Sequence, residues 1–395
     1  MPRIAILLLL VTIASCQGNR AVKQSGTSVS ENPSTSNPEP LPNFYKRYSG
    51  SIAGKPVVVQ LHCWNGSLQG SYQYRSSGQV IVLRDWMDSV RDDQYILVEF
   101  PGTGQEQNAV QTASWSIHFE GDRIKGEWHS GDEIQQGVID LQEDFPQGSR
   151  HFHTAYLADS ISLAAARPGS PKAVATTTYL LPDDADSNLI LQYLSAMFPD
   201  MYKDLSIESH IHRNNQLFFN DYRKINLHGL GVAGDSDENF TLNYTHDQNI
   251  SILYNENNWV VFQDFISTYT GGAHGNCSCS FTNLDVINHR AWSVLDIITD
   301  TTALRPLLND AAIEYFKLKP GDNMQDRLLI DQVPPTANVF ISGYGLTFVY
   351  NPYEIASYAD GQVSLFLPYR KLLPFLTPAF LNRMQLNPGT GSSRI

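Results

Sequence analysis

The chain has 395 residues and a formal net charge of −13 at pH 7. This length allows two or three domains, each with a sizeable core. The acidic balance argues against a nucleic-acid-binding protein, which presents basic patches to phosphate groups. A cationic partner would suit this charge, although many solubilised surfaces are also acidic.

The first 16 residues are typical of a targeting segment rather than of a fold. Arg3 and the free amine supply a positive start, and the apolar run 4–13 is too short to span a bilayer. The sequence Ile13-Ala14-Ser15-Cys16 resembles a bacterial lipobox, which implies cleavage before Cys16 and lipidation of its thiol. An ordinary signal peptide with a chance cysteine is the alternative. We therefore expect a lipoprotein of the bacterial cell envelope, anchored in the membrane by lipid and facing the periplasm or exterior.

The next two segments differ in patterning. Residues 17–42 are rich in Ser, Asn, Gly, Pro and Thr, so we expect a flexible linker. Residues 43–145 contain short alternating segments separated by turn residues, which predicts an all-β meander, a small barrel or sandwich. Gly70 and Gly126 are expected at tight bends of such a barrel. We expect side chains rather than a ligand to fill its interior.

Helical periodicity begins after residue 149, and the segment 149–385 predicts an α+β domain with an antiparallel sheet. The predicted helices cover 184–198, 207–222 and 302–318, and the predicted strands cover 239–245, 250–254 and 260–269. A strand, a strand and a short helix complete the domain, and residues 386–395 are expected to form a flexible tail. The change of pattern near residue 149 indicates that the two domains fold independently.

One turn stands out in the second domain, between the apolar run 259–266 and the alternating run 277–286. The adjacent Gly271 and Gly272 permit a sharp turn or a close backbone approach. We expect the turn to frame a ligand-binding surface, with the candidate residues Tyr269, Gly271, Gly272, Ala273, His274 and Asn276. His274 could satisfy backbone groups of the turn, contact a ligand, or act as a general base.

The order of these segments resembles the C-terminal domain shared by RsiV-type anti-sigma factors and PdaC-type peptidoglycan deacetylases. The pattern Tyr-x-Gly-Gly-Ala-His occurs at 269–274, and Leu295-Asp296-Ile297 follows in the position of a short helix. Further matches lie at 344–356 and 365–372. The resemblance covers about residues 150–385 and gives little information on the first 150 residues.

This resemblance implies a non-enzymatic binding or sensing module for a protein or cell-wall glycan, as the RsiV-type module binds lysozyme. The deacetylase motifs Thr-x-Asp-Asp and His-x-x-x-His do not occur in the sequence. We therefore assign no catalytic residue, and we expect neither a cofactor nor a nucleic-acid partner; no pattern indicates an oligomeric state. The alternative hypothesis is an envelope hydrolase acting on peptidoglycan or a related glycan, centred on His274 or on the His-x-His pairs.

The spacing of the remaining cysteines and histidines indicates no particular kind of site. Cys277 and Cys279 are two apart on a predicted strand and so share a face, where a disulfide between them would be strained. The pairs His151/His153 and His210/His212 lack a carboxylate or cysteine at ligand spacing, so we predict no metal site. The run 229–234 matches a dinucleotide fingerprint in letters, but an acidic loop and a strand follow it instead of a helix.

Overall fold

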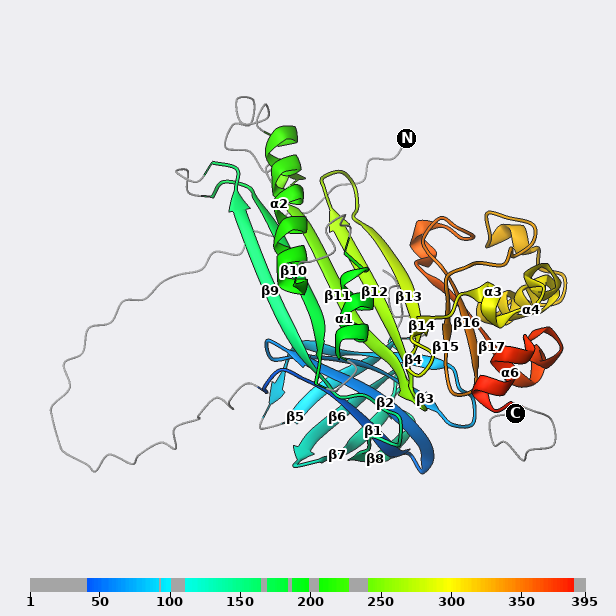
Figure 1. Cartoon of the computed structure of the whole chain (residues 1–395). Helices are drawn as coiled ribbons and strands as arrows, with labels where there is room; N and C mark the ends of the chain where they lie inside the picture. The colour runs from blue at the N-terminus through cyan, green and yellow to red at the C-terminus, as the bar shows by residue number, and fades with distance from the viewer. Residues whose placement is uncertain are drawn as a thin grey trace, which may run out of the picture. The chain divides into compact units, whose positions relative to one another are not determined.

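The computed structural model describes residues 41–91, 94–100, 111–164, 169–183, 187–198, 206–226 and 241–386. The predicted targeting segment with Cys16, most of the linker, the run 229–234 and the tail from residue 387 on lie outside these residues. The described residues belong to one compact unit, residues 39–395 (Figure 1). Within them, no helix is long and apolar enough to cross a membrane.

The first part is a closed barrel of eight antiparallel strands, so the predicted all-β fold is confirmed (Figure 1). Its strands are β1 (Phe44–Ile52), β2 (Lys55–Trp64), β3 (Ser67–Tyr74), β4 (Val80–Arg91), β5 (Gln94–Phe100), β6 (Ala113–Glu120), β7 (Arg123–Ser130) and β8 (Gln136–Glu143). They follow one another in chain order, and β1 pairs with β8 to close the sheet. The turn Ala53-Gly54 joins β1 and β2 with positive φ at both residues, as a two-residue hairpin turn requires.

Large apolar side chains pack inside this barrel, among them Tyr48, Leu83 and Trp115. Gly126 allows two strands to approach closely, because a Cβ at this position would lie 2.0 Å from the carbonyl oxygen of Ser116 on β6. The structure therefore requires glycine here for close approach of a neighbouring strand, while the expected tight bends at Gly70 and Gly126 stay a prediction.

One carboxylate lies among these apolar side chains. Glu99 is only 4% exposed, and its Oε1 accepts hydrogen bonds of 2.7 Å from the Tyr72 hydroxyl and from the indole N–H groups of Trp115 and Trp128. Three donors on one oxygen offset much of the cost of removing a charged group from water. The same charge raises the pKa of Tyr72, although burial is the larger cause.

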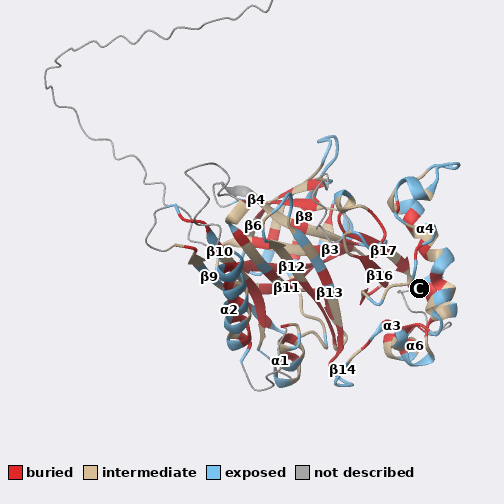
Figure 2. Ribbon diagram, turned by 90° about the horizontal axis from the view of Figure 1, so that it is seen from above, coloured by how far each residue is buried: buried red, intermediate tan, exposed pale blue. Residues whose placement is uncertain are grey.

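The second part contains a six-stranded sheet in the order β14-β13-β12-β11-β10-β9. Its strands are β9 (Phe152–Ser162), β10 (Lys172–Pro182), β11 (Tyr244–Glu256), β12 (Trp259–Tyr269), β13 (Asn276–Asp285) and β14 (Arg290–Ala291). All pairs are antiparallel except β10 with β11. A parallel pair needs a crossover, and helices α1 (Ser187–Ser195) and α2 (Ile207–Asn226) lie between these strands in the chain and cover one face of the sheet (Figures 1 and 2).

One prediction of strand boundaries was wrong. The expected strands at 239–245 and 250–254 are a single strand, β11, which begins at Tyr244 and ends at Glu256. The polar run Asp247-Gln248-Asn249 lies between the two expected strands. In the structure these three residues pair with β10 on one side and β12 on the other, so both neighbours satisfy the backbone of this polar run.

A three-stranded sheet and a group of short helices complete the fold (Figure 1). The strands are β15 (Val339–Ile341), β16 (Gly345–Tyr350) and β17 (Val363–Pro368). The helices are α3 (Val294–Ile297), α4 (Arg305–Tyr315), α5 (Tyr369–Leu372) and α6 (Pro378–Met384), with 3₁₀ turns η3 (Thr301–Leu304), η4 (Met324–Asp326), η5 (Tyr358–Asp360) and η6 (Leu373–Phe375). The predicted helix 302–318 is thus divided, and Pro306 lies in the first turn of α4, where its missing N–H has no partner to lose.

Polar contacts connect the barrel to the six-stranded sheet. Arg47 of β1 is 1% exposed and binds the carboxylate of Glu256 at 2.8 Å. The backbone N–H of Ile252 donates to Nε2 of His62 at 3.1 Å, and burial lowers the pKa of His62 to about 3, so this imidazole is neutral. Independent folding of the two parts stays a prediction.

Asp264 of β12 allows the effect of burial on a carboxyl group to be tested. It is 6% exposed, and burial raises its pKa to about 6, against a lowering by the hydrogen bond from Gln248. The unfolded chain loses this proton near pH 4 and the folded chain near pH 6, so stability falls as pH rises between these values and stays reduced above pH 6. We expect Asp264→Asn to remove this fall and to stabilise the protein at pH 8 by on the order of 2 kcal/mol.

Urea denaturation of both proteins between pH 4 and pH 8 measures this difference. Asp159→Asn, at an exposed aspartate of β9, serves as the control. A parent protein whose stability does not fall between pH 4 and pH 6 relative to Asp264→Asn would contradict the expected shift.

Candidate functional site

The Gly-Gly-Ala-His turn is the loop of the β12–β13 hairpin. Thr268 and Asn276 form the last pair of the ladder, and residues 269–275 connect them. The Tyr269 hydroxyl donates to the carbonyl oxygen of Gly272 at 3.0 Å, which ties the loop back to the end of β12. Gly272, Ala273, His274 and Asn276 are exposed, whereas Tyr269 and Gly271 are half-buried. The structure therefore brings all six candidate residues together on one loop.

Both glycines have positive φ angles, 87° at Gly271 and 91° at Gly272. A side chain is strained in this region of the backbone map. At Gly271 a Cβ would also lie 3.0 Å from the carbonyl oxygen of Thr241, whereas at Gly272 it would point into open space. Conformation alone requires the second glycine, and both conformation and close packing require the first.

The His274 side chain joins this loop to a distant segment. Its Nδ1 lies 2.7 Å from the carbonyl oxygen of Gly275, which satisfies a backbone group of the turn. Its ring stacks on Tyr358 with centroids 4.0 Å apart and planes at 24°. The Tyr358 hydroxyl donates to the same carbonyl of Gly275 at 2.6 Å.

Tyr353 extends this stack. Its ring lies 5.6 Å from that of Tyr358, with planes at 28°, and 57% of Tyr353 is exposed. We call His274, Tyr358 and Tyr353 the aromatic stack. These three rings come from two of the sequence motifs, 269–274 and 344–356, and from the turn η5 that follows them.

The backbone of Tyr353 is unusual. The N–H of Glu354 bonds the carbonyl oxygen of Asn351 at 3.0 Å across a four-residue turn, and Tyr353 has a φ of 71°. With Pro352 before it, this is the arrangement of a type II turn, whose third position usually holds Gly or Asn. A large aromatic residue in this position costs free energy, and such strain is concentrated at functional sites.

Other candidates from the sequence are not brought together. His153 of β9 pairs with Asp183, the residue after β10, at 2.8 Å. His210 and His212 diverge on α2, the first buried and the second exposed. Within the described ranges, no group of three His, Cys, Asp or Glu side chains could hold a metal ion. Cys63, Cys277 and Cys279 are free thiols.

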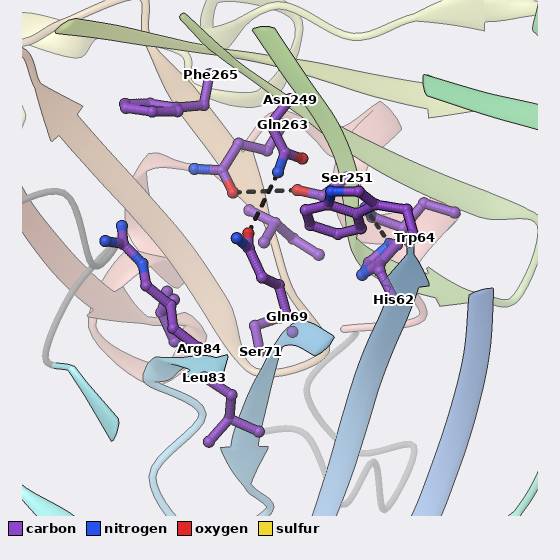
Figure 3. A pocket seen from close by; sticks show the side chains of 14 residues that line it. His62, Trp64, Gln69, Ser71, Leu83, Arg84, Asn249, Ser251, Gln263 and Phe265 are labelled. Atoms are coloured by element: carbon purple, nitrogen blue, oxygen red, sulfur yellow. Dashed lines mark hydrogen bonds between the residues drawn. The ribbon is translucent and has the colours of Figure 1, made fainter. Parts of the chain in front are cut away.

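Two cavities lie where the barrel contacts the second part. One, of about 200 Å³, is lined by Arg47, Asp144 and Glu256 among others, and both carboxylates bind Arg47. The other is lined by Arg84 and by the amides of Gln69, Asn249 and Gln263, among others (Figure 3). The sequence analysis did not identify these cavity residues, because they lie far apart in the chain. It did not single out Tyr353 of the aromatic stack either, although the position directly after Pro352 is a signal for a turn.

Substitution of the two loop glycines by alanine should lower the stability of the protein by different amounts. Gly272→Ala should destabilise the protein by about 1 kcal/mol through backbone strain alone. Gly271→Ala should cost more, because the Cβ would also press on the carbonyl oxygen of Thr241. Urea denaturation measures both, with the exposed Ala273→Ser as control, and equal stability of the two glycine variants would contradict the packing role of Gly271.

Comparison with known proteins gives a family for part of the chain. The model of the family described as "Protein of unknown function (DUF3298)" matches residues 295–370. None of the curated proteins matches. A crystal structure of a DUF3298 family member from Bacteroides fragilis NCTC 9343 is similar with a TM-score of 0.54 at 22% identity, covering 61% of this chain and 99% of that chain.

A DUF3298 family protein from Pseudomonas aeruginosa PAO1 has a TM-score of 0.42 at 18% identity, covering 57% of this chain and 95% of that chain. Only the Bacteroides fragilis structure, with its TM-score above 0.5, supports a shared fold. The stretch 295–370 includes Tyr353 and Tyr358 but not the His274 loop. Residues 295–370 are thus a DUF3298 domain, of a family whose function is unknown.

Proposed function

We propose that this protein is a lipid-anchored binding module of the bacterial cell envelope, and that the aromatic stack contacts its ligand. The observation that carries the proposal is Tyr353, which is strained in its backbone and more than half exposed. A strained turn that holds an aromatic ring in water lowers the stability of the protein. A role of this ring in ligand binding explains why the turn is present.

A cell-wall glycan is the ligand class that fits this surface best. Aromatic faces carry negative charge density, and the C–H groups on the faces of sugar rings are weakly positive. The exposed amide of Asn276 and the polar backbone of the Gly272–Gly275 segment lie on the same loop as His274, where they can meet sugar hydroxyl groups. A protein ligand remains the alternative, since tyrosines also anchor protein interfaces.

The affiliation with the RsiV- and PdaC-type domain and the envelope location belong to this proposal. The motifs at 269–274, 295–297 and 344–356 support the affiliation, and the lipobox-like sequence ending at Cys16 supports the location. His274 serves as a structural and ligand-contacting residue, because its Nδ1 is engaged by the loop backbone.

Binding to purified peptidoglycan sacculi tests the proposal, by co-sedimentation of the purified protein. Tyr353→Gly removes the ring and relieves the positive-φ strain, so we expect a variant at least as stable as the parent that binds sacculi at least fivefold more weakly. Ile287→Ala, which removes an exposed aliphatic side chain from the β13–β14 turn, should bind as the parent does.

The outcomes separate the alternatives. Unchanged sedimentation of Tyr353→Gly with sacculi would contradict a role of the stack in glycan binding. Capture of lysozyme that depends on Tyr353, without binding to sacculi, would identify a protein ligand instead. Release of soluble fragments from sacculi by the parent but not by a stable His274→Ala variant would support an envelope hydrolase.

The anchor has its own test. In a bacterial host, Cys16→Ser should release the protein from the membrane fraction, because the lipid is attached to that thiol. Fractionation followed by mass measurement of the N-terminal peptide detects both effects. A Cys16→Ser protein that stays in the membrane fraction with the same processing would contradict the lipid anchor.

A further inference from the structure

The pocket of Figure 3 lies between the outer surface of the barrel and one face of the six-stranded sheet. Directly paired residues of a sheet point to the same face. Gln69 pairs with Arg84 across β3 and β4, on the opposite face from the interior residue Leu83. Asn249 pairs with Phe265 on the facing sheet, so two ladders present their side chains to one space.

Arg84 has no counter-charge in this space. Among the described residues, the Arg84 guanidinium has neither an ion pair nor a hydrogen-bonding partner. It lies over the ring of Phe100, 5.4 Å from the ring centroid. Burial lowers the pKa of Arg84, against an opposing effect of Asp85. A half-buried cation without a hydrogen-bonding partner is unfavourable unless something else satisfies it.

Two other arginines, with side chains 1% and 15% exposed, are paired with carboxylates. Arg47 binds Asp144 and Glu256. Arg383 binds both oxygens of Asp285, at 2.8 and 2.9 Å. By contrast, no aspartate or glutamate is among the described residues that line the Arg84 pocket.

The polar groups around Arg84 include further donors. The Asn249 amide donates to Oε1 of Gln69 at 3.2 Å, so the Gln69 amide is oriented with its Nε2 donor group available (Figure 3). His62 accepts the N–H of Ile252 at Nε2, and since this imidazole is neutral its proton resides on Nδ1. The pocket therefore offers a cation and N–H donors, which is the chemistry that recognises an oxyanion.

We propose that this pocket binds the oxyanion group of a small ligand, a carboxylate or a phosphate, with Arg84 as its counter-charge and Gln69 as a neutral donor. Its volume of about 40 Å³ holds the equivalent of about three water molecules at roughly 10–15 Å³ each. That space suits one such group, while Trp64 and Phe265 at its wall can contact an apolar part of the ligand. This site is separate from the aromatic stack.

Thermal unfolding and calorimetric titration of the purified full chain test this site, with sodium phosphate and sodium acetate as probes and sodium chloride as the ionic-strength reference. We expect at least one oxyanion to raise the Tm of the parent above the chloride reference, because a ligand of the native state stabilises it. Arg84→Met should abolish this rise and weaken binding at least tenfold. Arg75→Met, which removes an exposed arginine of the barrel outside this pocket, should keep both.

A second readout separates a binding role from a structural one. Without added oxyanion, Arg84→Met should be at least as stable as the parent, because it removes an unpaired half-buried charge. Gln69→Leu should weaken binding at least threefold and provides an independent variant. A response to acetate alone identifies a carboxylate ligand, a response to phosphate alone a phosphate ligand, and a response to both the oxyanion group in general.

The proposal is overturned if neither probe binds the parent or shifts its Tm relative to chloride. It is also overturned if a folded Arg84→Met variant responds as the parent does. The absence of oxyanion binding to the parent overturns the proposal even if the variants do not fold.

Discussion

Asparagine side chains connect the edge of the six-stranded sheet to the three-stranded sheet. Asn283 on β13 donates to the carbonyl oxygen of Val339 and accepts the N–H of Ile341, both at 2.8 Å, so one amide bonds β15 as a backbone peptide would. Asn351 accepts the N–H of Cys279 at 2.8 Å, and Asn338 donates to the carbonyl oxygen of Cys279 at 2.9 Å. An amide offers both a donor and an acceptor, which is what an open sheet edge requires.

This connection determines where the aromatic stack lies. Cys279 is three residues after Asn276, the first residue of β13 beyond the Gly-Gly-Ala-His loop, and Asn351 is two residues before Tyr353. Bonding Asn351 to Cys279 therefore holds the strained turn next to the hairpin loop, where Tyr358 reaches Gly275 and His274. The ion pair of Arg383 with the fully buried Asp285 fixes the other end of β13 to α6. Burial alone would raise the pKa of Asp285, but the bonds from Arg383 and Asn288 hold it below its ordinary value.

Several buried charged groups of this protein are matched by partners within the chain. Glu99 receives three donors inside the barrel, and Arg47 and Arg383 are each paired with carboxylates. The partners of these groups lie within the chain, so packing and pairing explain why the groups are buried. Arg84 faces a polar pocket instead, and the exposed Tyr353 is held by a strained turn. The two proposed binding surfaces thus each include a departure from the usual rules of burial or backbone geometry.

The sequence by itself determined the parts of this protein that depend on local patterning. Alternating residues and turn signals identified the all-β part without deciding between a barrel and a sandwich. Periodicity identified the helices, and the paired glycines marked the hairpin loop with its positive φ angles. The expected division of β11 into two strands was wrong, because the polar residues between them pair with β10 and β12, whose positions the local sequence does not show. Only the tertiary structure decided that His274 meets Tyr358, 84 positions further along the chain, and that Arg84 faces Gln263. Such contacts arise from the packing of separate sheets, and local periodicity carries no information on which faces of two sheets meet.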